Sequence, residues 1–238
     1  MKEESNPRYQ INAMKAKYQK MRTVAERELS CSAHNMEHVM RVYTLCLQLA
    51  EGEPDIDLDV LIPAALLHDI ARVKEDCDET GTTDHALLGA EMAEKILHNF
   101  QYSKEKIEQV KHCIIAHRFR STLEPQTREA QILFDADKLD VLGAVGVARC
   151  FMIAGQYNER IYTKISVDEY AEDNLVDSIS HGRVKDISKH TPNLEFEIKL
   201  KHIPERLYTE KAKKIAQERL SFMTQFFEQL EKEIHGKV

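Results

Sequence analysis

The sequence predicts an all-α protein, and three observations support this prediction. The chain of 238 residues contains only 8 Gly and 6 Pro, so the strongest helix breakers are scarce. Apolar residues recur three or four positions apart over long stretches, which is the spacing of one helix face. Ser, Thr and Asp, which commonly cap helix N-termini, stand in front of several of these stretches.

The first two helices are expected over residues 8–29 and 32–51, with Ser32 as the candidate cap of the second helix. A third helix is expected to begin at Asp57 or Asp59 and to end near Ile70. Because proline fits best in the first turn of a helix, Pro63 favours a start nearer residue 60.

The middle of the chain is expected to continue as helices separated by polar turns. Residues 74–83 are predicted as a polar loop, after which Asp84 caps a helix over 85–99. Another helix is expected from Ser103 to about His117. Thr127 then opens a long sixth helix to about Ala154, which is too apolar on all sides to be a surface element.

The C-terminal part begins with a stretch, residues 155–192, that is predicted to be an irregular loop or lid. Residues 195–200 alternate as a strand would, but their apolar residues also fit a helix, which we prefer, with a kink at Pro204. Thr209 is the candidate cap of a last helix. The whole chain, 1–238, is therefore predicted to be a single all-α domain.

Charge and composition exclude several classes of protein. The formal net charge is −7, which argues against broad nucleic-acid binding through a basic surface. No apolar stretch reaches the length of a membrane span, and the N-terminus has no apolar leader. Five cysteines, odd in number and without a C-x-x-C pair, indicate reduced thiols and a cytoplasmic location. We expect no nucleic-acid or membrane partner; a homodimer is compatible with the sequence.

The doublet His68-Asp69 is the most informative feature, because it ends the apolar run of residues 61–67. Burying an imidazole and a carboxylate without partners costs free energy, and a divalent metal ion compensates both groups. Further candidate ligands stand elsewhere in the chain: His34, His38, His85, His117 and Asp137. His34 and His38 are four residues apart and thus share one helix face.

In this order the residues resemble the HD superfamily of metal-dependent phosphohydrolases, whose extended pattern is H…HD…H…H…D. The matching pieces include residues 65–70, 85–89, 116–119 and 135–140, and the resemblance covers nearly the whole chain from about residue 20. The sequence is most similar to small stand-alone bacterial HD hydrolases. The resemblance implies an HD metal-binding core over 20–154, with C-terminal helices, 193–238, packing on it.

The resemblance also implies a ligand set. His38, His68, Asp69 and Asp137 would hold one divalent ion, and Asp69 would bridge to a second. His85 and His117 stand where dinuclear members place ligands of that second ion. His34 stands where some members place a Glu ligand, although it is as readily a plain residue of a helix face. Mixed imidazole and carboxylate ligation favours Mn, Fe, Co or Ni over Mg.

The implied reaction is hydrolysis of a phosphoester or phosphoanhydride in a small metabolite, most plausibly a nucleotide. Asp69 and His68 would act through the metal, with Arg72 in the catalytic set because it follows the doublet where some members have Gly-Lys. Arg72, Arg118 and Lys138 are the candidate substrate contacts, since each is next to or one turn from a ligand.

Plainer and different interpretations remain open. His85 and His117 also fit a helix start and a helix end without metal, and the three cations also fit a solvated surface. The ligand pattern is compatible with an HD-type di-iron oxygenase as well as a hydrolase. A non-catalytic sensor of metal or nucleotide is a third possibility, although such degenerate domains usually lack ligands that this chain keeps.

Overall fold

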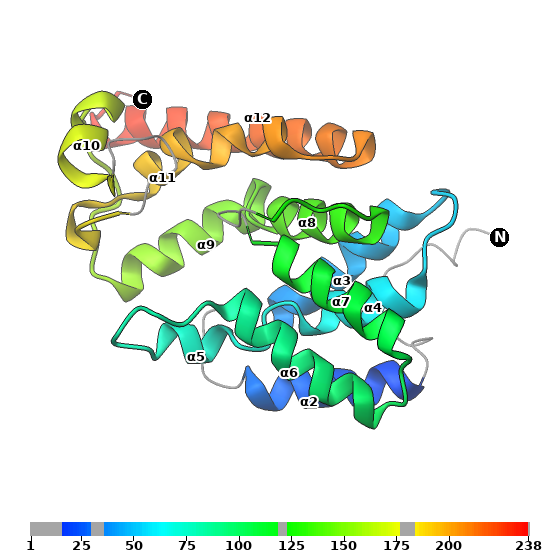
Figure 1. Ribbon diagram of the computed structural model, residues 1–238. Coiled ribbons are helices and arrows are strands. Elements are labelled where there is room, and N and C mark those ends of the chain that lie inside the picture. The colour runs from blue at the N-terminus through cyan, green and yellow to red at the C-terminus, as the bar shows by residue number, and fades with distance from the viewer. Residues whose placement is uncertain (1–15, 30–35, 119–122, 177–183, 238) are drawn as a thin grey trace. The chain divides into compact units, whose positions relative to one another are not determined.

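The computed structural model describes residues 16–29, 36–118, 123–176 and 184–237, and all regular elements in these ranges are helical (Figure 1). The only β-type pairing among them is an isolated bridge between Leu175 and Val184. The prediction of an all-α protein is therefore confirmed. The chain divides into two compact units, residues 1–137 and 138–238.

The first unit is built around a buried central helix. Its helices are α2 (Ala16–Glu28), α3 (Met36–Ala50), α4 (Leu58–Leu67), α5 (Arg72–Asp76), α6 (His85–Asn99), α7 (Lys104–Ala116) and the start of α8 (Arg128–Asp140). Helix α4 contacts α2, α3 and α7, and all its residues from Val60 to Leu67 are buried. The core of this unit therefore surrounds the helix that leads directly into the His68-Asp69 doublet.

Side-chain caps fix the starts of three helices, as predicted. The Asp57 carboxylate accepts from the backbone N–H of Asp59, and Asp84 accepts from those of Ala86 and Leu87. Ser103 caps α7 in the same way. Because Asp57 sets the start of α4 at Leu58, Pro63 lies in the second turn, so the later start that it favoured is wrong.

The predicted polar loop at 74–83 begins instead with a short helix, α5. Arg72 closes this single turn, because its guanidinium group pairs with Glu75 three residues later and Asp76 four residues later. The loop proper follows, and the Asp78 carboxylate accepts backbone N–H groups from Thr80, Thr82 and Thr83 there. The turn of α5 carries Glu75 towards the ligand cluster.

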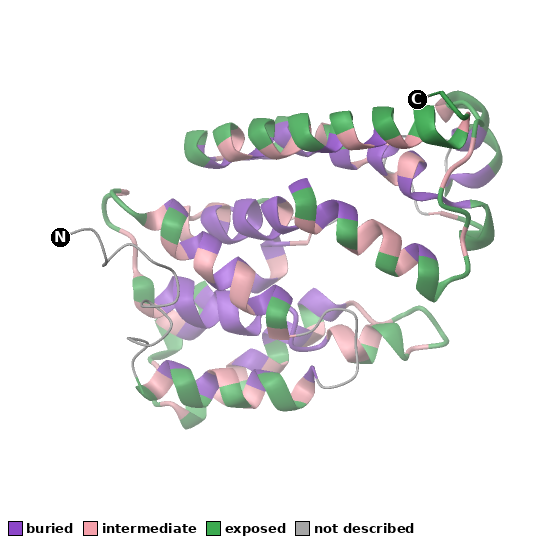
Figure 2. Ribbon diagram, turned by 180° about the vertical axis from the view of Figure 1, so that it is seen from behind, coloured by how far each residue is buried: buried purple, intermediate pink, exposed green. Residues whose placement is uncertain are grey.

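The second unit contains the remaining helices. They are α9 (Gly143–Gln156), α10 (Val167–Asn174), η2 (Ile187–Lys189), α11 (Pro192–Ile198), η3 (Leu200–Arg206) and α12 (Glu210–Ile234). Helix α12 starts at the predicted Thr209 cap and packs on α9 and η3, and Figure 2 shows it buried along one side and exposed along the other. The rings of Phe196 and Phe227 stack with centroids 4.8 Å apart.

The single helix predicted from Thr127 to Ala154 is wrong, because α8 ends at Asp140 and α9 begins at Gly143. Gly143 has φ +75°, and a Cβ there would lie 3.0 Å from the Arg219 side chain. A Cβ on Gly146 would lie 2.2 Å from the Val141 carbonyl oxygen. The break therefore depends on two glycines and on close approach of other groups to them.

The stretch 155–192 is only partly irregular, since it includes α10 with Ser166 as its cap. Within it, the buried Tyr170 hydroxyl lies 2.7 Å from Nδ1 of His190, and Asn174 donates to the same hydroxyl. Its role as a lid stays a prediction. Among the described residues no single helix is long and apolar enough to cross a bilayer, and only the bent pair α8 and α9 together reaches that length.

Candidate metal centre

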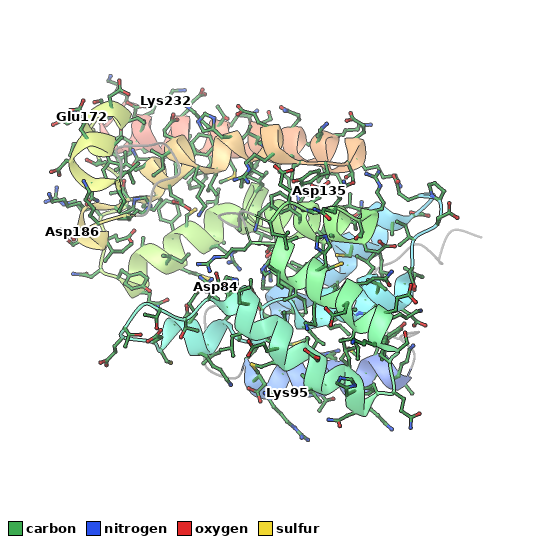
Figure 3. The ribbon with its side chains drawn as sticks, in the orientation of Figure 1. Asp84, Lys95, Asp135, Glu172, Asp186 and Lys232 are labelled. Carbon is green, nitrogen blue, oxygen red and sulfur yellow. The ribbon has the colours of Figure 1, made fainter. Side chains whose placement is uncertain are left out.

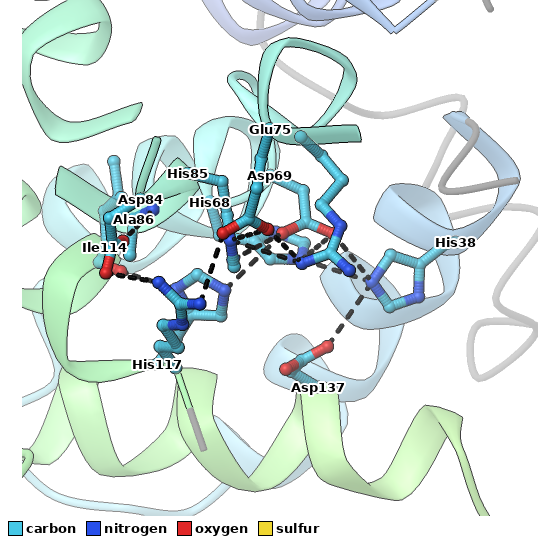
Figure 4. A network of polar contacts seen from close by, with 12 residues as sticks. His38, His68, Asp69, Glu75, Asp84, His85, Ala86, Ile114, His117 and Asp137 are labelled. Atoms are coloured by element: carbon cyan, nitrogen blue, oxygen red, sulfur yellow. Dashed lines mark hydrogen bonds and ion pairs between the residues drawn. The ribbon is translucent and has the colours of Figure 1, made fainter. Parts of the chain in front are cut away.

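Six of the seven predicted ligands gather in the first unit. Five different helices supply them: His38 lies in α3, His68 and Asp69 directly follow α4, His85 begins α6, His117 follows α7, and Asp137 lies in α8. None of the six is more than 8% exposed. Figure 4 shows their side chains converging. The seventh, His34, lies outside the described residues.

Asp69 is at the middle of the cluster, and its two oxygens face different imidazoles. Oδ2 lies 3.5 Å from Nε2 of His38 and 3.8 Å from Nε2 of His68. Oδ1 lies 3.6 Å from Nε2 of His85 and 3.5 Å from Nε2 of His117. One carboxylate thus divides four imidazoles into two pairs, as expected of a bridging ligand.

The first pair is completed by a second carboxylate. Nε2 of His38 lies 3.3 Å from Oδ1 of Asp137 and 3.3 Å from Nε2 of His68. Two triads have ligand atoms that all lie within 4.8 Å of one another: His38, His68 and Asp137, and His68, Asp69 and His117. Each triad offers imidazole nitrogen and carboxylate oxygen and could hold a metal ion.

Contacts on the far side of three imidazoles assign their tautomers. Nδ1 of His68 lies 2.9 Å from the Ala65 carbonyl oxygen, and Nδ1 of His117 contacts the Ile114 carbonyl oxygen. Nδ1 of His85 lies 2.8 Å from the Glu75 carboxylate. Because these oxygens only accept, each Nδ1 carries the hydrogen and each Nε2 presents a lone pair to the cluster.

The centre of the cluster is therefore lined by hydrogen-bond acceptors. The Nε2 lone pairs of His68, His85 and His117 and the anionic oxygens of Asp69 face one another at 3.5 to 3.8 Å. Acceptors that face one another in a buried cluster repel, and a cation relieves that repulsion. These nitrogen and oxygen atoms are suitable metal ligands for one or two divalent ions, and two ions would share Asp69.

Electrostatics favours the ligand form of His68, His85 and Asp69. Burial lowers the pKa of His68 to about 4, although the Asp69 carboxylate acts in the opposite direction. Burial, followed by the charge of His117, lowers the pKa of His85 to about 4. Burial acts to raise the pKa of Asp69, but in acid the protonated imidazoles of His68 and His117 hold it well below its usual range. At neutral pH the imidazoles of His68 and His85 are neutral and the carboxylate is ionised, which is what a metal ion requires.

Charged side chains lie against the outer nitrogen of His85. Arg72 donates to Oε2 of Glu75 at 2.8 Å, and Arg118 pairs with Oε1 of the same carboxylate at 3.2 Å. Arg118 also pairs with Asp84, the cap of α6. Two of the predicted substrate contacts thus lie beside the ligands. Glu75 was missed from the sequence, although the Arg72-to-Glu75 spacing is that of a helical ion pair.

The remaining predicted groups occupy other positions. Lys138 directly follows Asp137 in α8 but belongs to the second unit, so its contact with substrate stays a prediction. Asp140 pairs with Arg149 at 3.9 Å within that second unit. Asp135, labelled on α8 in Figure 3, is fully buried. Burial, with smaller contributions from the charges of Asp137 and Asp135, raises the pKa of the Cys46 thiol.

Comparisons with known proteins find relatives over most of the chain. The model of the HD domain family matches residues 35–142. YpgQ from Bacillus subtilis is 32% identical over 209 residues, which are 86% of each chain. The crystal structure of YpgQ in complex with ADP has a TM-score of 0.67 at 28% identity and covers 91% of this chain and 94% of its own.

Two further relatives extend the comparison. An HD-superfamily hydrolase from Bacillus thuringiensis has a TM-score of 0.66 at 26% identity, covering 92% of this chain and 97% of its own. The 3'-5' exoribonuclease YhaM of Bacillus licheniformis is 30% identical over 139 residues. That match spans 52% of this chain but only 44% of YhaM, so less than half of the exoribonuclease is represented.

Proposed function

This chain belongs to the HD superfamily, and we propose that it is a metal-dependent phosphohydrolase acting on a small phosphorylated metabolite of the nucleotide class. The bond cleaved is a phosphoester or a phosphoanhydride. One observation carries the proposal: both oxygens of Asp69 face pairs of imidazole Nε2 atoms at 3.5 to 3.8 Å in a buried cluster. This arrangement does not stabilise the fold, because burying so many acceptors together costs free energy.

Divalent ions bound there would act as Lewis acids towards a phosphoryl oxygen and lower the pKa of a coordinated water. We propose that His38, His68 and Asp137 hold one ion and that His85 and His117 hold the other. Asp69 would then be the ligand common to both. Mn, Fe, Co and Ni suit the imidazole-rich set better than Mg does. The ligand residues are at most 8% exposed, so bulk water has little access to them.

Arg72 and Arg118 would bind the phosphate group of the substrate. Their side chains are 26% and 28% exposed, so a substrate can reach them. Arg72 lies 3.2 Å from Nδ1 of His85, and Arg118 pairs with Glu75, which contacts the same nitrogen. Guanidinium groups bind phosphate oxygens in a bidentate manner and stabilise the charge that develops during phosphoryl transfer. The ADP complex of YpgQ supports a nucleotide as the substrate class.

The test is a screen for phosphate release by the purified protein over nucleoside mono-, di- and triphosphates, in the presence of Mn, Co, Fe or Mg. We expect release with at least one nucleotide, loss of activity in EDTA, and loss in His68→Ala. Release should be unchanged under argon. The failure of every phosphorylated compound with metal-loaded protein would contradict the proposal.

Two added conditions separate the alternatives. Turnover that requires oxygen and iron would identify a di-iron oxygenase. A labelled RNA oligonucleotide should be included because of the similarity to YhaM. If the protein preferentially shortens the RNA from its 3' end, its substrate is a polynucleotide and not a small metabolite.

A further inference from the structure

We infer that Glu75 is a positioning residue that couples the metal ligand His85 to the phosphate-binding pair Arg72 and Arg118. The inference rests on the proposed function, because it takes His85 as a ligand and the two arginines as substrate contacts. It adds that one carboxylate serves both parts of the site with opposite effects on them.

The first part concerns the tautomer of His85. Oε2 of Glu75 lies 2.8 Å from Nδ1 of His85, and Nη1 of Arg72 lies 3.2 Å from the same nitrogen. Arg72 can only donate, so it and a protonated Nδ1 cannot bond to each other. An unprotonated Nδ1 would turn its lone pair towards the Glu75 anion. The arrangement is satisfied when Nδ1–H donates to Glu75, which leaves Nε2 free for a metal ion and makes it more basic.

The second part concerns the arginines. Glu75 receives Arg72 at 2.8 Å on Oε2 and Arg118 at 3.2 Å on Oε1, so its two oxygens hold both guanidinium groups. The Glu75 side chain is 18% exposed, less than either arginine, so it orients them from the inner side. A substrate phosphate approaching the arginines has to compete with this carboxylate for the same N–H groups.

Removing the charge of Glu75 should therefore have a divided effect. His85 loses the anion that raises its basicity, so metal binding weakens. The arginines lose an opposing charge, so their attraction for phosphate increases. A residue that only stabilised the fold would weaken both kinds of binding together when it was replaced.

The test uses Glu75→Gln, which keeps the size and an accepting oxygen but removes the charge. The matched control is Glu94→Gln, a partly exposed carboxylate on α6 that pairs with Lys111. Calorimetric titration of the metal-free proteins with Mn²⁺ measures the affinity of each ion. Titration with inorganic phosphate at saturating Mn²⁺ measures the affinity of the arginine pair for phosphate. Thermal unfolding of the metal-free proteins monitors the fold.

In Glu75→Gln we expect the second Mn²⁺ to bind about 10- to 100-fold more weakly, with the first ion unaffected. We expect phosphate to bind about 3- to 10-fold more tightly once Mn²⁺ is saturating, since one opposing charge is gone at a partly exposed site. Glu94→Gln should match the wild type in both titrations.

Unchanged Mn²⁺ binding in Glu75→Gln would overturn the inference, as would weaker binding of both Mn²⁺ and phosphate with a lowered melting temperature. Wild-type protein that binds a single Mn²⁺, unaffected by His85→Ala, would also overturn it. These titrations need no turnover. If the phosphate-release screen fails but the divided effect is found, the proposed reaction is wrong and the role of Glu75 stands.

Discussion

Oδ1 of Asp69 lies 3.5 Å from Nε2 of His117, whereas His38 faces the other carboxylate oxygen, Oδ2. The contact joins residues 48 positions apart and exists because α4 and α7 pack side by side and both end at the cluster. Because of this contact, imidazoles face both oxygens of Asp69, and we therefore expect two ions rather than one.

Replacing Asp69 should abolish binding of both ions. In Asp69→Asn the anionic oxygens are lost, and one becomes an amide nitrogen that cannot coordinate. We expect the affinity for Mn²⁺ to fall by more than about 100-fold at both sites, because replacing a residue that only hydrogen-bonds to a ligand already costs about 10- to 100-fold. Calorimetric titration measures this. Retention of one tightly bound ion would show that Asp69 is not shared.

Removing ligands from one side should remove one ion. His85→Ala leaves His38, His68, Asp69 and Asp137 in place, so we expect the metal content to fall from about two ions per chain to about one. Elemental analysis of protein dialysed against Mn²⁺ gives the ratio. Loss of all metal from this variant would be inconsistent with two separable positions.

The metal-free protein should lose stability as the pH falls from 6.5 to about 4. The folded pKa of His68, about 4, is below its unfolded value of 6.5, so the unfolded chain binds more protons in this window. His85 shifts in the same direction. Stability from these groups is fully present above pH 6.5, and His68 alone accounts for up to about 3 kcal/mol. Urea unfolding at pH 7.0, 5.5 and 4.5 in EDTA measures it, and a flat profile that is the same in His68→Gln would contradict the shift.

The glycines at the junction of α8 and α9 should resist substitution. Gly146→Ala places Cβ 2.2 Å from the Val141 carbonyl oxygen and should cost about 1–3 kcal/mol of unfolding free energy. Gly143→Ala forces a side chain to φ +75° at about 1–2 kcal/mol. Gly155→Ala is the matched control, because nothing lies within 4 Å of its Cβ and alanine favours helix. Equal stabilities of all three variants would refute a special role for the junction.

The sequence was sufficient where the signal is local. The Asp84, Ser103 and Thr209 caps each act within three residues of their own position, so these helix starts could be predicted, whereas Asp57 was only one of two candidates for its helix. The convergence of ligands was predicted from resemblance to a family rather than from geometry. Periodicity alone does not show that the ends of α4 and α7 meet.

The sequence was insufficient where distant residues decide. The apolar pattern continues through Val141 and Leu142, so nothing in it marks the end of α8. The break is stabilised by Arg219, 80 positions from Leu139, whose carbonyl oxygen accepts from its guanidinium group. Glu75 was missed for the same reason, since its partner His85 is ten residues away across a polar loop.

The most direct measurement is X-ray diffraction at the manganese absorption edge from crystals grown with Mn²⁺. We expect two anomalous peaks, one between Asp69, His38 and His68 and one between Asp69, His85 and His117. A map without a peak beside Asp69, or with Mn²⁺ bound only elsewhere on the chain, would contradict the assignment of this cluster as a metal centre.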